Sequence, residues 1–214
     1  MSEKVKPTRR RYHSPVRAEQ AQRTRARILD AAEDQFAQRG YAATTITAIA
    51  RAAEVAPDTI YATFKNKRGL LGALVETRVR GAATPVLKQS GPEAVRAETD
   101  QRRQIEIFVP DITERTERAQ TVYGVVAEAA ASDPEAAALH KAMLDQRYGN
   151  LHKFVGWIEA NGPLRDKLTR DQATASVWTI TSTEVFRLLR AQRGWSKARY
   201  RRWMTDTLTR LLLP

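Results

Sequence analysis

The sequence contains no cysteine among its 214 residues. This absence excludes a disulfide framework, thiolate metal sites, iron–sulfur clusters and a cysteine nucleophile. Long apolar runs are also missing: none approaches the roughly 18–20 residues that cross a bilayer. No apolar stretch follows the charged N-terminus in the way of a secretory signal. We therefore expect a cytoplasmic protein with no membrane partner.

The sequence also lacks the common catalytic and metal-binding motifs. The sequence has no GxGxxG or GxxxxGK[ST] motif to hold a phosphate and no HExxH. There are three histidines, His13, His140 and His152. The last two stand twelve residues apart, with no flanking pair of carboxylates at ligand spacing. We expect no catalytic residue, no metal and no cofactor, and hence no enzyme.

Glycine and proline are few, 10 and 9 residues, and fall mostly between segments of helical apolar periodicity. No useful stretch alternates apolar and polar residues as a strand does. The chain is therefore predicted to be all-α, with about nine helices. The expected ranges are 18–38, a short helix capped by Thr45, 57–64, one from 66 or 67 to about 80, 93–109, 111–132 beyond Pro110, 134–161, 171–193 and 196–213, with a loop at 81–92.

Basic residues exceed acidic ones, 36 to 24, which gives a formal net charge of +12 and a pI near 10.4. Such an excess favours a polyanionic partner, with nucleic acid the leading candidate. The densest segment is 1–17, which holds six basic side chains against Glu3. We expect residues 1–17 to form a flexible basic tail. A flexible arm of this kind can still enter a narrow minor groove.

Residues 45–64 predict two short helices joined by a three-residue turn. Thr45 is a good N-cap for the first helix, and Pro57 suits the first turn of the second. In the turn, Val55 can pack on Ile60 and fix the entry angle of the second helix. That helix then buries Ile60 and Phe64 on one side only, as a helix-turn-helix requires.

These residues carry a family resemblance. The segment T24-R-A-R-I-L-D-A-A32, then Phe36, Gly40-Tyr41, Thr44-Thr45, Ile49-Ala50, Val55, Thr59-Ile60-Tyr61, Phe64, Lys67 and Leu70-Leu71 resemble the tetracycline-repressor (TetR) family of bacterial transcription regulators. Two positions depart from the family pattern. Glu54 stands where the family usually has glycine, and Ala56 where it often has a Ser or Thr cap. These departures bear on the geometry of the turn.

The resemblance implies an N-terminal helix-turn-helix domain at 18–66 and a ligand-binding and dimerisation domain at 67–214. It also implies a second helix of the motif that lies in the major groove of an operator, where its first exposed residues meet the bases. Asp58 either accepts from a cytosine amine or stabilises its own helix end. Tyr61 is expected on a phosphate. The DNA-binding candidates are Thr44, Thr45, Pro57, Asp58, Tyr61, Ala62, Lys65 and Lys67.

The second half is expected to enclose a small-molecule pocket and to pair with a second copy. Aromatic and polar residues of the middle helices are the pocket candidates, although such stripes are commonly core: Phe108, Tyr123, His140, Met143, Tyr148, Phe154 and Trp157. The last two helices supply the pairing candidates, again on stripes that any core helix shows: Trp178, Val185, Leu188, Leu189, Tyr200, Trp203, Met204, Leu208 and Leu211.

The function expected from these features is that of a homodimeric repressor, released from a palindromic operator by a small-molecule effector. Two alternatives stay open. A charge-driven DNA binder would show a large salt dependence and little discrimination between sequences. A regulator without a small-molecule ligand would fill its pocket with its own side chains.

Overall fold

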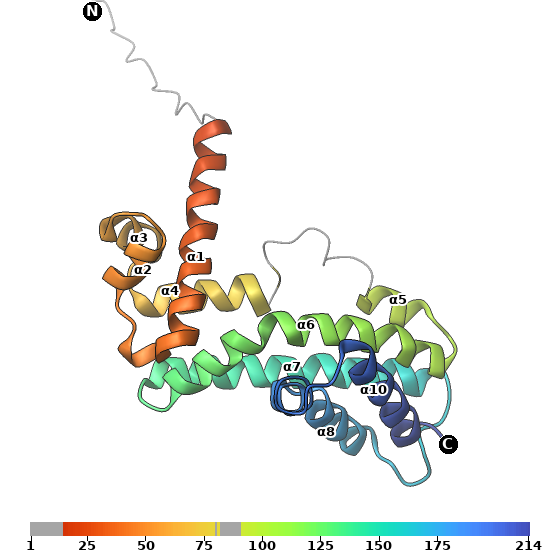
Figure 1. Cartoon of the computed structure of the whole chain (residues 1–214). Coiled ribbons are helices and arrows are strands. Elements are labelled where there is room, and N and C mark those ends of the chain that lie inside the picture. The colour runs from red at the N-terminus through yellow and green to blue at the C-terminus, as the bar shows by residue number, and fades with distance from the viewer. Residues whose placement is uncertain (1–14, 80, 82–90) are drawn as a thin grey trace, which may run out of the picture.

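The computed structural model describes residues 15–79, 81 and 91–214, and every regular element in these ranges is helical (Figure 1). The α-helices are α1 (Pro15–Ala43), α2 (Ile46–Ala52), α3 (Pro57–Phe64), α4 (Lys67–Leu74), α5 (Gly91–Ala97), α6 (Gln101–Ala130), α7 (Pro134–Ala160), α8 (Arg170–Ile180), α9 (Thr183–Arg187) and α10 (Lys197–Leu212). Two π-helical turns, η1 (Val75–Val79) and η3 (Leu188–Gln192), continue α4 and α9. The predicted fold class, an N-terminal helix-turn-helix followed by a helical domain, is confirmed.

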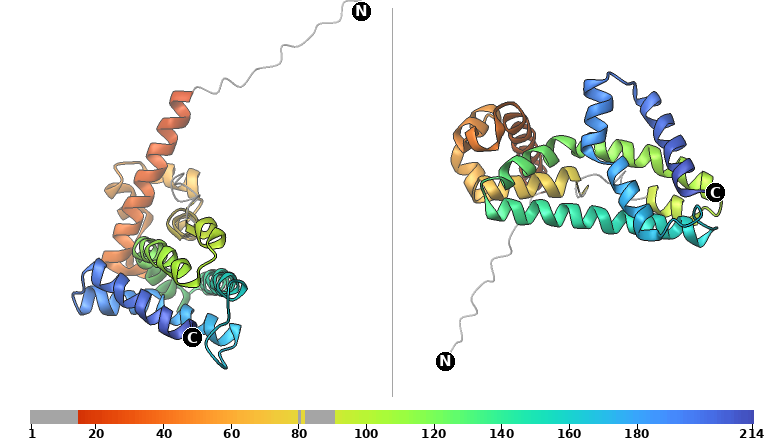
Figure 2. Two further views of the ribbon diagram at one scale, coloured as in Figure 1. Left: turned by 90° about the vertical axis from the view of Figure 1, so that its right-hand side faces the viewer. Right: turned by 90° about the horizontal axis from the view of Figure 1, so that it is seen from below.

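Helices α6 and α7, of 30 and 27 residues, form an antiparallel pair that runs the length of the molecule (Figures 1 and 2). Helices α1 to α4 gather at one end of this pair and form what we call the head. Helices α5, α8, α9 and α10 pack on the pair toward its other end and form, with it, the body. The C-terminus lies at the end of the body away from the head (Figure 1).

Buried apolar side chains form two clusters, one for each end of the molecule. The head core contains Phe36, Ile60 and Leu71 from α1, α3 and α4, and it also takes Val126 from α6 and Met143 from α7. The body core is built from the other halves of α6 and α7 with α5 and α8 to α10. Because α6 and α7 contribute to both cores, they connect the head to the body through continuous helix.

The first helix is longer than predicted. It begins at Pro15, three residues inside the expected tail, and helical structure continues beyond Gly40 as far as Ala43. Gly40 itself is not helical, with φ 78° and ψ 161°, so the expected break falls where the glycine stands. This conformation is open to glycine and costly for other residues. Residues 1–14, with most of the predicted basic tail, lie outside the described part of the chain.

The prediction of one helix over 93–109 and a break at Pro110 was wrong. The break lies earlier, where Glu98 Oε1 accepts from the backbone N–H groups of Thr99 and Asp100, and Asp100 then caps α6 by accepting from Arg103 N at 2.8 Å. The helix α6 runs straight through Pro110. An internal proline costs about 3 kcal/mol, but Phe108 and Val109 beside it are buried in the body core, which favours the continuous helix.

The predicted helix over 171–193 is also divided. It breaks after Ile180, where Thr181 Oγ1 donates to Val177 O at 2.8 Å and Ser182 caps α9 by accepting from Val185 N. Hydroxyl side chains offer the backbone such alternatives to helical bonding. The chain therefore changes direction between α8 and α9 in the part that carries the predicted dimer surface.

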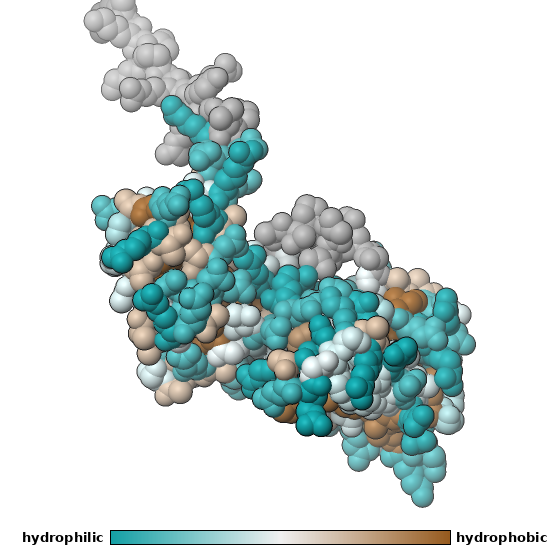
Figure 3. Space-filling view, viewed as in Figure 1, coloured by the Kyte–Doolittle hydropathy of each residue, from teal (hydrophilic) through white to brown (hydrophobic). Residues whose placement is uncertain are grey.

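The face seen in Figure 3 is mostly hydrophilic, with small hydrophobic areas scattered over it. Among the helices of the described ranges, none combines the length and the apolar character that a membrane crossing needs.

Candidate nucleic-acid interface and ligand cavity

The turn between α2 and α3 has the geometry of a helix-turn-helix. Thr45 caps α2 as predicted, with its Oγ1 accepting from Ala48 N at 3.1 Å. Glu54 then takes a left-handed conformation, φ 52°, which turns the chain toward α3. Val55 is half-buried against the head core, and its N–H donates to Ala50 O at 3.0 Å. The turn is thus built in the glycine-like conformation although the residue is glutamate.

This strain can be measured by substitution. Replacing Glu54 with glycine should stabilise the protein by about 0.5–1 kcal/mol. The left-handed conformation costs a non-glycine residue roughly 1–2 kcal/mol. Part of the gain is lost because glycine gives up more conformational entropy on folding. Urea unfolding at fixed protein concentration measures the change. Glu54→Ala is the control, since alanine keeps the strained Cβ and should bring no gain. Equal effects of the two substitutions would show that the strain is absent.

Helix α3 presents one side to the core and the other to solvent. Ile60 and Phe64 are buried, and the guanidinium of Arg25 from α1 lies 4.6 Å from the Phe64 ring. Ala56 gives α3 no side-chain cap, and Pro57 occupies its first turn. Six of the predicted DNA-binding residues are solvent-exposed: Thr45, Pro57, Asp58, Tyr61, Ala62 and Lys65. Within the described ranges, Tyr61 is one of two large hydrophobic side chains that are strongly exposed, at 50%.

Two of the predicted DNA-binding residues make hydrogen bonds inside the head. Thr44 is only 1% exposed, and its hydroxyl donates to Gln35 O and Gly40 O at 3.0 and 2.8 Å. Lys67 directs its ammonium group inward, to Tyr41 O at 2.8 Å and Thr44 O at 3.0 Å. A cation at these carbonyls satisfies the C-terminal end of α1. Both side chains are thus bonded within the head and not turned to the exposed side of α3.

Helix α4 begins close against the end of α3. Asn66 caps it by accepting from Gly69 N at 2.8 Å. Gly69 is required here, because a Cβ on this residue would lie 2.0 Å from Phe64 O. The close approach of α4 to Phe64 fixes α3 relative to the rest of the head. Neither feature was found from the sequence, although Asn66 followed by Gly69 is a recognisable helix start.

Polar contacts join the head to the body. Tyr41 N donates to Glu128 Oε1 of α6 at 2.9 Å, and Arg68 of α4 pairs with Asp133 at the start of α7 at 3.6 Å. Burial raises the pKa of Tyr41, and the nearby Asp133 carboxylate raises it further. These contacts tie the end of α1 and the start of α4 to the α6–α7 corner.

A second link runs through the end of η1. Arg118 of α6 donates from Nε to the carbonyl of Arg78 at 3.1 Å, and the Arg78 side chain pairs with Glu33 of α1 at 2.7 Å. Desolvation lowers the pKa of Arg118. Since α6 also forms one wall of the cavity described next, this link joins that wall to the first helix of the head.

A cavity of about 330 Å³ lies between α5, α6 and α7. This volume is at the lower end of the range for small-molecule sites, about 300–1,000 Å³. Five of the seven predicted pocket residues line it: Phe108, Tyr123, Met143, Phe154 and Trp157. The Phe108 and Phe154 rings stack at 3.8 Å between centroids and 14° between planes.

The other two predicted pocket residues lie elsewhere. His140 does not line the cavity, and Tyr148 donates to Asp171 Oδ1 of α8 at 2.8 Å on another side of α7. Polar lining residues that the sequence prediction missed are Asp111, Arg115, Gln146, Arg147, Asn150 and Lys153. The spacing of those on α7 was a usable signal, because they share the face that carries Met143, Phe154 and Trp157.

The predicted dimer residues divide into buried and accessible groups. Tyr200, Met204 and Leu208 are almost completely buried in the body core of one chain, so they cannot form a surface for a partner. Burial raises the pKa of the Tyr200 phenol. Leu188 is 49% exposed. The remaining members are partly buried at the rim of the body core: Trp178, Val185, Leu189, Trp203 and Leu211.

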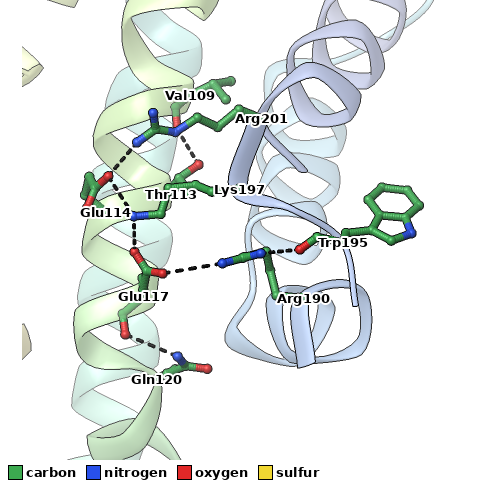
Figure 4. A network of polar contacts seen from close by, with 9 residues as sticks. All are labelled: Val109, Thr113, Glu114, Glu117, Gln120, Arg190, Trp195, Lys197 and Arg201. Atoms are coloured by element: carbon green, nitrogen blue, oxygen red, sulfur yellow. Dashed lines mark hydrogen bonds and ion pairs between the residues drawn. The ribbon is translucent and has the colours of Figure 1, made fainter. Parts of the chain in front are cut away.

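An ion-pair network holds this last part of the chain on α6 (Figure 4). Lys197 Nζ lies 3.2 Å from Glu114 Oε1 and 2.5 Å from Glu117 Oε2. Arg201 pairs with Glu114 at 2.5 Å, and Arg190 approaches Glu117 at 3.8 Å. The network fixes η3 and the start of α10 to the middle of α6.

Within the described ranges, no group of three or more His, Asp or Glu residues is placed to hold a metal ion. The geometry thus defines a helix-turn-helix head on a helical body that contains a small cavity.

Comparison with known proteins agrees with this class. Residues 28–74 match the family model described as bacterial regulatory proteins, tetR family. The regulator TtgR of Pseudomonas putida is 48% identical over 59 residues, and the regulator YvkB of Bacillus subtilis is 50% identical over 52 residues. The first alignment covers 28% of this chain and 28% of TtgR, and the second covers 24% of this chain and 28% of YvkB. The sequence matches therefore span less than a third of these relatives.

Solved structures extend the likeness over the whole fold. SmeT in complex with triclosan matches 90% of this chain and 92% of its own, with a TM-score of 0.70 at 18% identity. A protein from Saccharomonospora viridis in complex with choline matches 90% of this chain and 99% of its own, with a TM-score of 0.68 at 18% identity. Residues 28–74 are thus similar to the TetR family, as the sequence resemblance indicated, and the solved structures share the fold.

Proposed function

We propose that this protein is a DNA-binding transcriptional regulator, a homodimeric repressor that a small-molecule effector releases from a palindromic operator. The observation that carries this proposal is the head: α3 is anchored by buried Ile60 and Phe64 and turns an exposed face outward. The face is short and flanked by the capped start of α2. A helix about two turns long fits the major groove, which is about 12 Å wide.

The exposed residues divide by chemistry. Pro57 and Ala62 offer apolar contact to thymine methyl groups, and Asp58 is an acceptor for a cytosine amine or a stabiliser of the start of α3. Thr45, Tyr61 and Lys65 are donors for phosphate oxygens, which set the register of the head on the duplex. No Arg, Asn or Gln stands among these side chains, so bidentate reading of guanine or adenine is not supplied by this helix.

We divide the chain by role as the sequence suggested: a basic tail at 1–17, the DNA-binding domain at 18–66 and the ligand-binding and dimerisation domain at 67–214. For dimerisation we propose the accessible members of the predicted set. They are Trp178, Val185, Leu188, Leu189, Trp203 and Leu211. A two-fold dimer through α8 to α10 would present two heads to half-sites about one helical turn apart.

Release of DNA requires an effector that binds two arrangements of the chain with different affinity. The cavity is the proposed binding site of the effector. The contacts from Arg118 to Arg78 and from Arg78 to Glu33 connect the α6 wall of the cavity to α1. A ligand that shifts α6 would change the position of α1 and with it the head.

Selection of bound duplexes from a random DNA pool tests the proposal. We expect an enriched palindrome whose half-sites are spaced by about one turn, with the full-length chain bound as a dimer. Adding candidate effectors to the bound complex then tests release. Binding without sequence preference and with a steep salt dependence would instead establish the charge-driven alternative.

A further inference from the structure

The cavity has an apolar end and a polar end. On α7 the lining residues Arg147 and Phe154 are seven residues apart, about 10 Å along the helix. Across the cavity, antiparallel α6 places Phe108 against Phe154 and Tyr123 near Arg147. Trp157 extends the apolar end beyond Phe154. The cavity is thus shaped for a molecule that is flat and apolar at one end and polar at the other.

The lining charges are unbalanced. Asp111 is the one carboxylate among the lining residues, and Arg115 already pairs with it at 2.7 Å from Nε to Oδ2. Arg147 and Lys153 remain, and no ion pair to either is present among the described residues. The residues that line the cavity therefore carry an excess of positive charge at the side of α7.

Arg147 is held in a fixed position. Its Nη2 donates to Trp178 O and to Thr181 Oγ1, each at 2.7 Å, and its guanidinium lies 5.6 Å from the Trp178 ring. These hydrogen-bond partners are neutral and orient the group, while the nearby Glu184 carboxylate acts on Arg147 without forming an ion pair with it. Desolvation lowers the pKa of Arg147, and the nearby Tyr123 and Glu184 partly oppose this effect. The fork-shaped guanidinium has further donors, Nε and Nη1, that make no hydrogen bond within the described residues.

We propose that the cavity binds an amphipathic organic carboxylate, with the carboxylate on Arg147 and a flat apolar body between α6 and α7 beside Phe108, Phe154 and Trp157. This inference rests on the proposed function and names the chemical class of its effector. A carboxylate accepts two hydrogen bonds from a guanidinium at once and neutralises it. Lys153 adds attraction at the α7 side.

The same geometry disfavours a cation. A quaternary ammonium such as choline, the ligand in the Saccharomonospora viridis complex, would share a partly buried space with Arg147, and like charges repel strongly where water is scarce. Asp111 does not offset this repulsion, because Arg115 neutralises it.

Three probes of one shape separate the contributions of charge and apolar area. We would use 2-naphthoate, 2-naphthalenemethanol and 2-naphthylmethylammonium, titrated into the full-length protein at pH 7.5 and followed by calorimetry and by thermal shift. We expect 2-naphthoate to bind roughly ten- to a hundredfold more tightly than the alcohol, as a charge-assisted bidentate contact implies. The ammonium probe should bind most weakly.

Substitution of Arg147 then tests the site. Arg147→Gln should remove the preference for 2-naphthoate over the alcohol while the alcohol still binds, and retained alcohol binding shows that the cavity is intact. Arg147→Lys should keep part of the preference, because it keeps the charge without the fork. Arg102→Gln is the control: it removes one exposed arginine of α6 that does not line the cavity, and should change nothing.

Equal affinity for 2-naphthoate and the alcohol, stronger binding of the ammonium, no binding of any probe, or an unchanged preference in Arg147→Gln would each overturn this inference. Failure of the proposed function gives a different result. If 2-naphthoate binds with the expected preference but no DNA sequence is enriched, the ligand class stands and the regulator proposal falls. If an operator is found and only neutral or cationic effectors release it, the reverse holds.

Discussion

Replacing Gly69 with alanine should destabilise the protein by about 2–3 kcal/mol, the upper part of the range for a side chain forced into packed space. The new Cβ would stand 2.0 Å from Phe64 O and 3.1 Å from Phe64 C, and both atoms belong to backbone that cannot rotate away. Relief requires α4 to move from the end of α3, which disturbs the seat of the recognition helix. Urea unfolding and operator affinity should therefore both report the substitution.

The same helix provides a matched control. Gly72 is one turn further along α4, and a Cβ added there meets nothing within 4 Å. Gly72→Ala should stabilise the protein by about 0.5–1 kcal/mol, because alanine is the better helix former. Opposite signs for the two substitutions are the expected result. A stabilising effect at both positions would mean that α4 does not approach Phe64 as closely as described.

Replacing Tyr61 with alanine should weaken operator binding by roughly ten- to a hundredfold, the usual range for loss of a direct contact of about 1–3 kcal/mol. Stability should change little, because half of the Tyr61 side chain is exposed and it does not belong to the head core. Fluorescence anisotropy with the selected operator measures affinity, and urea unfolding confirms that the fold is unchanged.

Two further variants show which part of Tyr61 and which side of α3 contact the DNA. Tyr61→Phe keeps the ring and removes the hydroxyl, so a loss close to that of alanine assigns the contact to a hydrogen bond on phosphate. Thr63→Ala changes an exposed residue of the same helix that points away from the proposed groove face and whose hydroxyl donates to Thr59 O. It should leave affinity within about twofold of the parent. Similar losses at Tyr61 and Thr63 would contradict the proposed orientation of α3.

The head was predictable because its signals are local. Thr45, Pro57 and the apolar pair Ile60 and Phe64 each act within one turn of helix, and the structure has α3 at the predicted bounds. The roles of Thr44 and Lys67 were not predictable in this way. Their partners are carbonyl groups at the end of α1, brought to them only by the tertiary fold.

In the body, the sequence pattern predicted the helices more accurately than it predicted what each helix packs against. The stripe that includes Tyr200, Met204 and Leu208 has helical spacing, but spacing does not tell whether an apolar face meets its own core or a partner. Pro110 predicted a break in the helix, but α6 continues through it because residues on both sides of the proline are packed in the folded chain. Arg147 shares the cavity face of α7 with Met143 and Phe154, but helical spacing alone does not distinguish an arginine in a cavity wall from a solvated one.

Because α6 and α7 contribute to both cores, the head is not a unit that can be joined unchanged to the body of another protein. A DNA-reading module cut at residue 66 would lack Leu71 and Leu74 of α4 and the wall supplied by Val126 and Met143. A chimera that grafts this head onto a foreign sensor must therefore also import the α6–α7 corner, with Glu128 and Asp133 to receive Tyr41 and Arg68. The structural unit that supports the proposed DNA-binding face is the head together with that corner.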